Sequence, residues 1–223
     1  MQSREFSIRM HGTLACFSRP EFSTERVSYE LITPSAARGV VEAVLWKPAI
    51  QWEITRIALL KPVGWISFRR NEVNHRASTQ NAQRAAQGGT QMPEFYADED
   101  RAQRSTLALR EVDYGVCARF RMTARTGAGD SVRKFEEMFE RRLAKGQHHY
   151  QPFLGCREFP AAVEPWDGKG ALIAETRDLG WMLHDIAFHT VSGKTVTNEA
   201  RFFPAALHEG VVTVPAWEMA VGA

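Results

Sequence analysis

Three absences narrow the function of this 223-residue chain before any motif is considered. Its cysteines, Cys16, Cys117 and Cys156, are few, odd in number and without a CxxC pair, which argues against a disulfide framework and a structural zinc site. No apolar run approaches the roughly 20 residues that a membrane-spanning helix needs. The first residues also lack a hydrophobic signal segment. We therefore expect a cytoplasmic protein without a membrane contact.

The motifs of several common enzyme classes are also missing. The chain contains no P-loop, GxSxG, HExxH or GxGxxG pattern. His184 and His189 would lie on opposite faces of a predicted strand, and Asp178, Asp185 and Glu199 have no metal-ligand spacing. The sequence therefore predicts a protein without a cofactor or a bound metal.

What the chain does contain is an ordinary globular composition with an uneven distribution of charge. It is 44% hydrophobic and 24% charged, with a net charge of +2. Between Arg69 and Arg84 four arginines face a single acid, Glu72. Such a stretch indicates a patch for a polyanion, although a solubilising loop would have the same composition.

Two amphipathic helices have marked ends. The first spans 33–48, with Thr33 as N-cap, Pro34 in the first turn and Pro48 as terminator. The second spans 131–145, with Asp130 as N-cap and Gly146 directly after its end. Each carries apolar residues at the spacing of one helix face, so we expect both to cover a sheet.

Alternating or apolar segments between and around the helices predict strands. They lie at 5–11, 50–60, 63–68, 105–124 and 153–163, and a phase slip at Thr55 predicts a β-bulge. This order favours an α+β fold with a ferredoxin-like (RNA-recognition-like) domain over 1–165. Short strands with turns over 166–223 indicate a small β-rich C-terminal domain.

The segment 71–103 differs from the rest of the first domain. It is rich in Asn, Gln, Ala, Gly and Arg, and no apolar periodicity runs from 80 to 91. Because such a segment buries little apolar surface, we expect a protruding basic arm that is mobile without a partner.

Two clusters of polar residues suggest chemistry on or after the second helix. His148 and His149, followed by Tyr150, could transfer protons or bind phosphate, although an exposed loop would look the same. Arg133 and Lys134 at the start of the helix could bind phosphate, and a solvated helix face is the alternative.

Several stretches together resemble the CRISPR-associated Cas-five proteins of subtype I-C, the d variant. The resemblance covers about residues 5–190, and its most specific parts are Trp46-Lys47-Pro48 and the segment from Leu154 to Phe159. The matching stretches are 12–20, 25–30, 34–48, 69–73 and 153–160.

The resemblance implies an endoribonuclease that cuts the repeat of a CRISPR precursor RNA at the base of its hairpin. It also implies that the protein stays on the 5′ handle of the mature CRISPR RNA, as a subunit of the type I-C interference complex in antiviral defence. In this family a 2′-hydroxyl attacks the neighbouring phosphate without a metal, which requires a general base and a general acid. A contact of the protein with DNA is possible under this resemblance and is left open.

Two family positions depart from the pattern. A Tyr is replaced by Leu45, and a Lys-His pair by Lys134 followed by Phe135. Only Lys134 carries over, so His148, His149 and His11 are the other candidate catalytic residues. The candidate RNA-binding residues lie mostly in or beside the matching stretches: Arg26, Arg38, Lys47, Arg69, Arg70, Tyr150 and Arg157.

Two alternatives remain beside RNA cleavage. One is a structural RNA-binding subunit of the same complex that cuts weakly or not at all. The other is a metal-free enzyme for small molecules, which the basic arm and the missing cofactor motifs disfavour. Cleavage of repeat RNA in EDTA would separate the three.

Overall fold

The computed structural model describes residues 1–22, 24–75, 78–88, 96–168, 172–191 and 194–222. The side chains of 188–198 are outside this description as well. The helices are α1 (Pro34–Val44), α2 (Thr79–Ala86), α3 (Val132–Ala144) and a short 3-10 helix, η1 (Trp217–Met219). The strands are β1 (Phe6–Ala15), β2 (Arg26–Val27), β3 (Ile50–Leu59), β4 (Gly64–Val73), β5 (Arg101–Met122), β6 (Ala162–Pro165), β7 (Arg177–Val191), β8 (Lys194–Leu207), β9 (Val211–Thr213) and β10 (Val221–Gly222).

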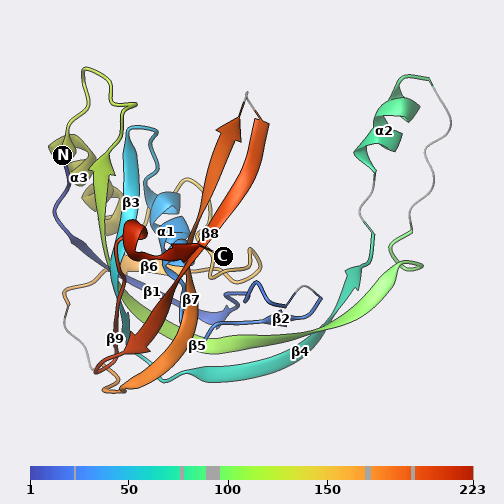
Figure 1. Ribbon diagram of the computed structural model, residues 1–223, viewed down its shortest axis with the longest axis horizontal. Helices are drawn as coiled ribbons and strands as arrows, with labels where there is room; N and C mark the ends of the chain where they lie inside the picture. The colour runs from blue at the N-terminus through green and yellow to red at the C-terminus, as the bar shows by residue number, and fades with distance from the viewer. Residues whose placement is uncertain (23, 76–77, 89–95, 169–171, 192–193, 223) are drawn as a thin grey trace.

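The molecule is a mixed α/β structure built on a large sheet and a small one (Figure 1). The large sheet has the order β6-β1-β5-β3-β9, and β2 and β4 pair with β5 on another part of its length. The small sheet has the order β10-β8-β7. All the named strand pairs are antiparallel except β2 with β5. The predicted α+β class is confirmed at this level.

Aromatic side chains join α3 to one face of the large sheet. Phe139 of α3 lies 4.9 Å, between ring centroids, from Phe6 of β1 and 4.6 Å from Trp52 of β3. Phe135 contacts Phe120 of β5 edge to face. Burial of such rings is the largest single source of core stability, so these contacts fix the position of α3.

The helix α1 begins as predicted and ends early. Thr33 accepts a hydrogen bond from the Ala36 amide, and Pro34 occupies the first turn. Leu45, however, is extended (φ −147°, ψ 110°), so the helix ends at Val44 and the predicted continuation to Pro48 is wrong. Trp52 of β3 donates its indole hydrogen bond to the Leu45 carbonyl at 2.8 Å and so stabilises this extended residue.

The cap of α3 is Ser131 and not Asp130. The Ser131 hydroxyl accepts a hydrogen bond from the Lys134 amide at 3.2 Å. The Asp130 carboxylate accepts instead from the Gly127 amide and from the Lys134 ammonium. Both residues are good N-caps, and the chain selects the one directly before the helix.

The strand β3 contains the predicted bulge, with the register shifting between Ile54 and Arg56. The strand predicted at 153–163 is wrong over most of its length. Only β6 at its end is extended and paired, and Phe153 and Pro160 form an isolated bridge. Gly155 breaks the strand because it has a φ of +83°, which side chains rarely adopt.

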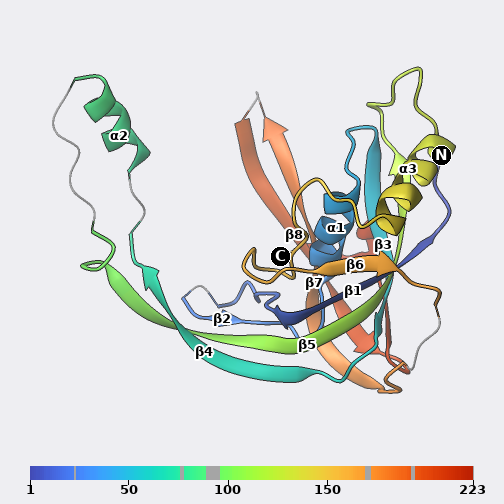
Figure 2. The same cartoon turned by 180° about the vertical axis from the view of Figure 1, so that it is seen from behind.

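The described residues of the segment 71–103 project from the body on the paired ends of β4 and β5 (Figures 1 and 2). The segment contains α2. This helix was not predicted from the sequence, because it has no apolar face to bury. Ser78 caps α2, and Ala and Gln favour helix without packing. Residues 76–77 and 89–95 of the predicted arm lie outside the described residues.

The C-terminal segment contributes to both sheets. A long hairpin of β7 and β8 occupies much of 166–223, where short strands were predicted. The strand β9 pairs with β3 of the large sheet, so the predicted boundary at 165 does not separate the two sheets. In the described part of the chain, no helix is long and apolar enough to span a membrane.

Candidate active site

An open pocket of about 550 Å³ lies at the C-terminal end of α3. Its walls come from β1, the end of α1, the loop after α3 and the start of β6. His11 of β1 and His148 of the loop both line it, together with Gln147 and Gln151. Two predicted catalytic residues from distant parts of the chain therefore line one cavity.

His11 is fixed by the sheet and by a neighbouring carboxylate. It is paired with Asp113 of β5 on one side and Ala162 of β6 on the other. Its Nε2 lies 3.8 Å from Oε1 of Glu164, and that carboxylate is also bonded to Arg9 at 2.8 Å. The strand pairing and the Glu164 carboxylate therefore hold His11 in place on the sheet.

His148 lies in a loop that is anchored to the end of α1. Gly146 closes α3 in the left-handed conformation (φ +61°), as predicted for the residue after the helix. The His149 amide donates to the Ala43 carbonyl at 2.7 Å, and Arg142 donates to the Val44 carbonyl at 2.9 Å. These bonds hold the loop beside α1 and keep His148 at the rim of the pocket.

His149 and Tyr150 do not line this pocket. The two rings contact each other at 6.3 Å, and the Tyr150 hydroxyl donates to the Gly39 carbonyl of α1 at 3.3 Å. Burial, together with the Glu42 carboxylate, raises the pKa of Tyr150. The adjacent histidines therefore differ: one lines the cavity and the other faces α1.

The N-terminal end of α3 carries Lys134, the one residue that matches the family pair. Its ammonium is 3.0 Å from Oδ1 of Asp130 and 3.1 Å from the Gly129 carbonyl. The Gly127 amide and the Lys134 ammonium lower the pKa of Asp130, so that carboxylate is a poor base. Leu45 and Phe135 are 0% and 2% exposed, so both fill the core.

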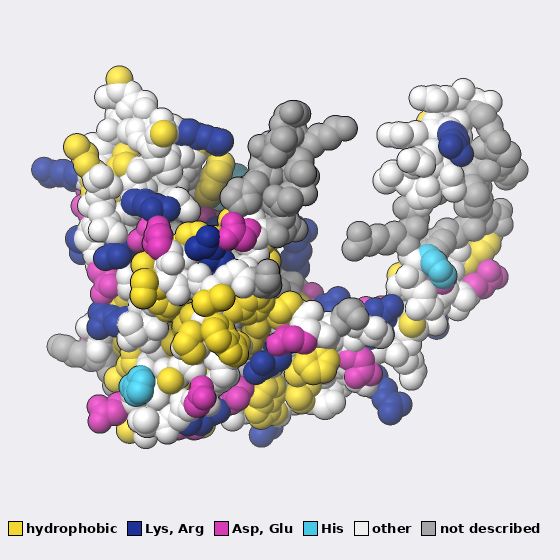
Figure 3. Space-filling view, viewed as in Figure 1, with side chains coloured by type: hydrophobic (Ala, Val, Ile, Leu, Met, Phe, Trp, Pro, Cys, Tyr) yellow, Lys and Arg dark blue, Asp and Glu magenta, His cyan; other side chains and the backbone are white. Residues whose placement is uncertain are grey.

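A cluster of three arginines and two glutamates lies where the arm leaves the body. Arg26 of β2 is 3.2 Å from Glu72 and 3.6 Å from Glu158, and Arg70 of β4 contacts Glu158. Arg104 of β5 lies 3.8 Å from Glu72. Figure 3 shows basic and acidic side chains side by side along this base of the arm.

This arginine cluster (Arg26, Arg70 and Arg104) retains unused hydrogen-bond donors. Among the described residues, Nε and Nη2 of Arg70 and Nε of Arg104 are buried without a hydrogen bond, although Nη2 of Arg70 and Nε of Arg104 lie 3.5 and 3.8 Å from the Glu72 carboxylate. Three guanidinium groups also outnumber the two carboxylates by one positive charge. An anion such as a phosphate would balance this excess charge. The sequence did not indicate Arg104 as a binding residue, because only its pairing with Arg70 across the sheet places it in this cluster.

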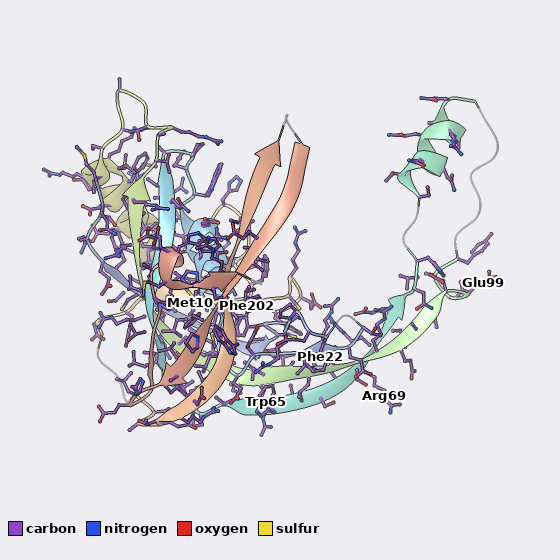
Figure 4. All side chains as sticks on the ribbon, viewed as in Figure 1. Met10, Phe22, Trp65, Arg69, Glu99 and Phe202 are labelled. Carbon is purple, nitrogen blue, oxygen red and sulfur yellow. The ribbon has the colours of Figure 1, made fainter. Side chains whose placement is uncertain are left out.

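The other predicted RNA-binding residues are scattered. Arg38 is bonded to Asp185 of β7 at 2.7 Å and to Glu42 at 2.7 Å, so it ties α1 to the small sheet. Arg69 points away from the body, on the other face of β4 from Arg70 (Figure 4). Arg157 is exposed and Lys47 is half-buried. Within the described residues, no group of three or more His, Cys, Asp or Glu side chains is placed to hold a metal ion.

Comparisons with known proteins show clear relatives. A family model described as CRISPR-associated protein (Cas_Cas5) matches residues 7–215. A CRISPR pre-crRNA endoribonuclease Cas5d of Mannheimia succiniciproducens is 43% identical over 219 residues, which are 93% of this chain and 94% of that protein. A protein of the same name from Thermus thermophilus is 40% identical over 222 residues, 94% of this chain and 90% of its own.

Two solved structures have a similar fold. A crystal structure of a CRISPR-associated protein has a TM-score of 0.71 at 21% identity and covers 99% of this chain and 96% of its own. A functionally uncharacterized protein from Streptococcus mutans has a TM-score of 0.69 at 20% identity, with the same coverage. At these identities the similarity concerns the fold alone.

Proposed function

This chain belongs to the Cas5 family of CRISPR-associated proteins, and from that membership we propose that it is an endoribonuclease that cuts CRISPR precursor RNA. Two relatives that bear the name of this activity match it over more than nine-tenths of its length. The observation that supports the proposal on the structural side is that His11 and His148 line one open pocket.

The pocket suits cleavage through the 2′-hydroxyl of the RNA. In this reaction the 2′-oxygen attacks the adjacent phosphorus while a base removes its proton, and an acid protonates the departing 5′-oxygen. The products are a 2′,3′-cyclic phosphate and a free 5′-hydroxyl. We assign the base to His11, whose Nε2 lies 3.8 Å from Oε1 of Glu164, and the acid to His148.

The arginine cluster and the pocket are joined by the segment 152–161. Glu158 of this segment contacts Arg70, while Pro152, Pro160 and Ala161 line the pocket. An RNA strand whose phosphate occupies the arginine cluster would therefore cross this segment to reach the histidines. Sequence-independent phosphate contacts of this kind set the register of the strand on the protein.

We extend the proposal to the later role of the protein, its retention on the 5′ handle as a subunit of a type I-C interference complex. The order β6-β1-β5-β3, with α1 and α3 as connections, supports the predicted ferredoxin-like domain. The alternative of an inactive structural subunit draws its support from Leu45 and Phe135, which fill the core at the two positions where the family resemblance implies polar groups.

The decisive experiment is cleavage of a labelled repeat RNA, in EDTA and in magnesium, beside the same RNA with a 2′-deoxy substitution at the cut. We expect equal rates in both buffers, a cyclic phosphate product and no cutting of the deoxy substrate. Cutting of the deoxy substrate would overturn the mechanism. Binding without cutting would establish the structural subunit instead.

A matched pair of arginine variants tests the RNA path. Arg70→Gln removes a charge inside the arginine cluster, and Arg69→Gln removes one from the opposite face of the same strand. We expect the slope of log Kd against log salt to fall by about 0.7 for Arg70→Gln, the value for one phosphate contact to a single strand. An equal effect of both variants would place the RNA elsewhere.

A further inference from the structure

An exposed tryptophan lies between the open pocket and the N-terminal end of α3. Trp46 follows Leu45, the first extended residue after α1. Successive side chains of an extended chain point to opposite sides, so the burial of Leu45 turns Trp46 outward, and Trp46 is 58% exposed. The indole therefore faces solvent because of how the chain leaves α1, and it adds little to the core.

The segment that carries Trp46 is held in place on both sides of this residue. Before it, Arg142 of α3 donates to the Val44 carbonyl at 2.9 Å. After it, the Pro48 carbonyl accepts from the Thr123 hydroxyl at 2.7 Å, and Thr123 begins the loop that leads into α3. Because these bonds fix the backbone around Trp46, a ligand that binds the indole would not have to order this segment first.

On one side, Trp46 is next to the pocket of the two histidines. Val44 lines that pocket together with His11 and His148. Two residues of extended chain span at most about 7 Å, so the backbone of Trp46 lies within one nucleotide's reach of the pocket wall. A strand with a phosphate in the pocket would therefore pass the indole if it ran along α3 toward its N-terminal end.

On the other side, Trp46 is followed by a pair of cations at the N-terminal end of α3. The Lys134 ammonium lies 3.0 Å from the Asp130 carboxylate. The Gly127 amide and the Lys134 ammonium lower the pKa of Asp130, and the charge of Lys47 adds to this effect. Two ammonium groups therefore act on one carboxylate, which leaves one positive charge for an anion.

We propose that Trp46 is a stacking platform for an unpaired base of the RNA beside the cut, an inference that rests on the proposed cleavage of RNA. The scissile phosphate lies in the pocket, the base stacks on the indole, and an adjoining phosphate binds between Lys47 and Lys134. An aromatic ring beside cations is the usual arrangement for binding single strands, and it tolerates any sequence because every base has a π-face. This platform therefore selects unpaired nucleotides and not a particular base.

A second exposed tryptophan provides a matched control. Trp181 of β7 is exposed to nearly the same extent, 55%, and lies on the small sheet, where it pairs with Pro204 of β8. Single exposed apolar side chains are common on protein surfaces and have no function by themselves. Exposure alone predicts equal effects of Trp46→Ala and Trp181→Ala on RNA binding, whereas the platform predicts an effect at Trp46 only.

The test is a double-mutant cycle between the full-length protein and a repeat hairpin RNA with unpaired flanks. In the RNA, one unpaired nucleotide beside the cut at a time lacks its base. We expect Trp46→Ala to weaken binding of the intact RNA by about fivefold or more, and the abasic change at one position to weaken binding to the unaltered protein equally. The two changes together should weaken binding no more than either alone, because they remove the same contact.

Two further variants complete the test. Trp46→Phe keeps an aromatic ring and should retain most of the affinity, while Trp181→Ala should bind as the unaltered protein does. Circular dichroism establishes that each variant is folded. Additive effects in the cycle at every position, or equal losses in Trp46→Ala and Trp181→Ala, would overturn the platform.

Cleavage by the unaltered protein is scored separately, so that the two proposals can fail independently. Binding without cleavage would overturn the nuclease, and the cycle would still decide on the platform because it measures binding alone. Cleavage with an additive cycle would overturn the platform and leave the nuclease in place. A protein that binds no repeat RNA would overturn both.

Discussion

The two ends of α3 offer different chemistry to a phosphate. At the C-terminal end, His11 and His148 line an open pocket, and Glu164 lies beside His11. At the N-terminal end, Lys134 is bonded to Asp130 and to a backbone carbonyl, and the following side chain, Phe135, is buried. Thirteen residues at 1.5 Å each separate the ends by roughly 20 Å, so one scissile phosphate cannot use both.

The comparison shows that a cation and an acid–base pair need not occupy the same place. A lysine at a helix N-terminus can hold a phosphate, because the ammonium and the helix dipole both attract it. It does not supply the two proton transfers of the reaction. Two histidines can supply them, since an imidazole can act both as a general base and as a general acid.

The largest effect is expected at the pocket. His148→Ala should lower the rate of single-turnover cleavage by ~10²-fold or more, because it removes the proton for the 5′-oxygen. The adjacent His149→Ala should stay within about threefold of the original rate, since His149 does not line the pocket. The comparison uses saturating protein, so that binding does not contribute.

The same experiment can show that the chemistry does not lie at the C-terminal end of α3. A loss of cleavage in His149→Ala with a normal rate in His148→Ala would exclude the pocket. His11→Ala provides an independent check, because it alters the opposite wall and should give a loss of similar size. If both pocket variants cut normally, the chemistry lies at the Lys134 end.

The next effect concerns the two apolar positions. Restoring polar groups with Leu45→Tyr and Phe135→His should not raise the cleavage rate, because both side chains point into the core. Each change buries a polar group without a prepared partner and should destabilise the fold by ~1–3 kcal/mol. Urea unfolding measures this loss. A gain in cleavage without a loss of stability would show that these positions can serve the substrate.

The local sequence was sufficient to predict parts of this fold and not others. The start of α1, the core face of α3 and the bulge in β3 were predictable because caps, apolar spacing and phase slips act within a few residues. The helix α2 was not, because it buries nothing. The prediction of a strand at 153–163 was wrong because the Gly155 backbone packs closely against the Cys16 carbonyl. No local pattern in the sequence reveals this contact.

The candidate site, too, was only partly predictable from the sequence. His11 and His148 could each be selected as a titratable residue, yet their meeting depends on the pairing of β1 with β6 and on the loop that Ala43 anchors. Arg104 was not predicted, because it joins the arginine cluster only through its pairing with Arg70 across β4 and β5. Conversely, Arg69 and Arg70 are neighbours in sequence and face opposite sides of a strand. Spatial contacts across the sheet, and not residue types, decide these cases.

The smallest effect is expected from Lys134→Ala, and it tests the comparison from the other end. The ammonium is partly neutralised already, because Asp130 and the Gly129 carbonyl both bind it. We therefore expect cleavage to slow by less than about tenfold, mainly through weaker binding, as for the loss of one exposed phosphate contact. Arg133→Ala is the matched control, since Arg133 pairs with Glu137 on the exposed face of the same turn. A loss of ~10²-fold at saturating protein in Lys134→Ala, with Arg133→Ala normal, would move the scissile phosphate to the N-terminal end of α3.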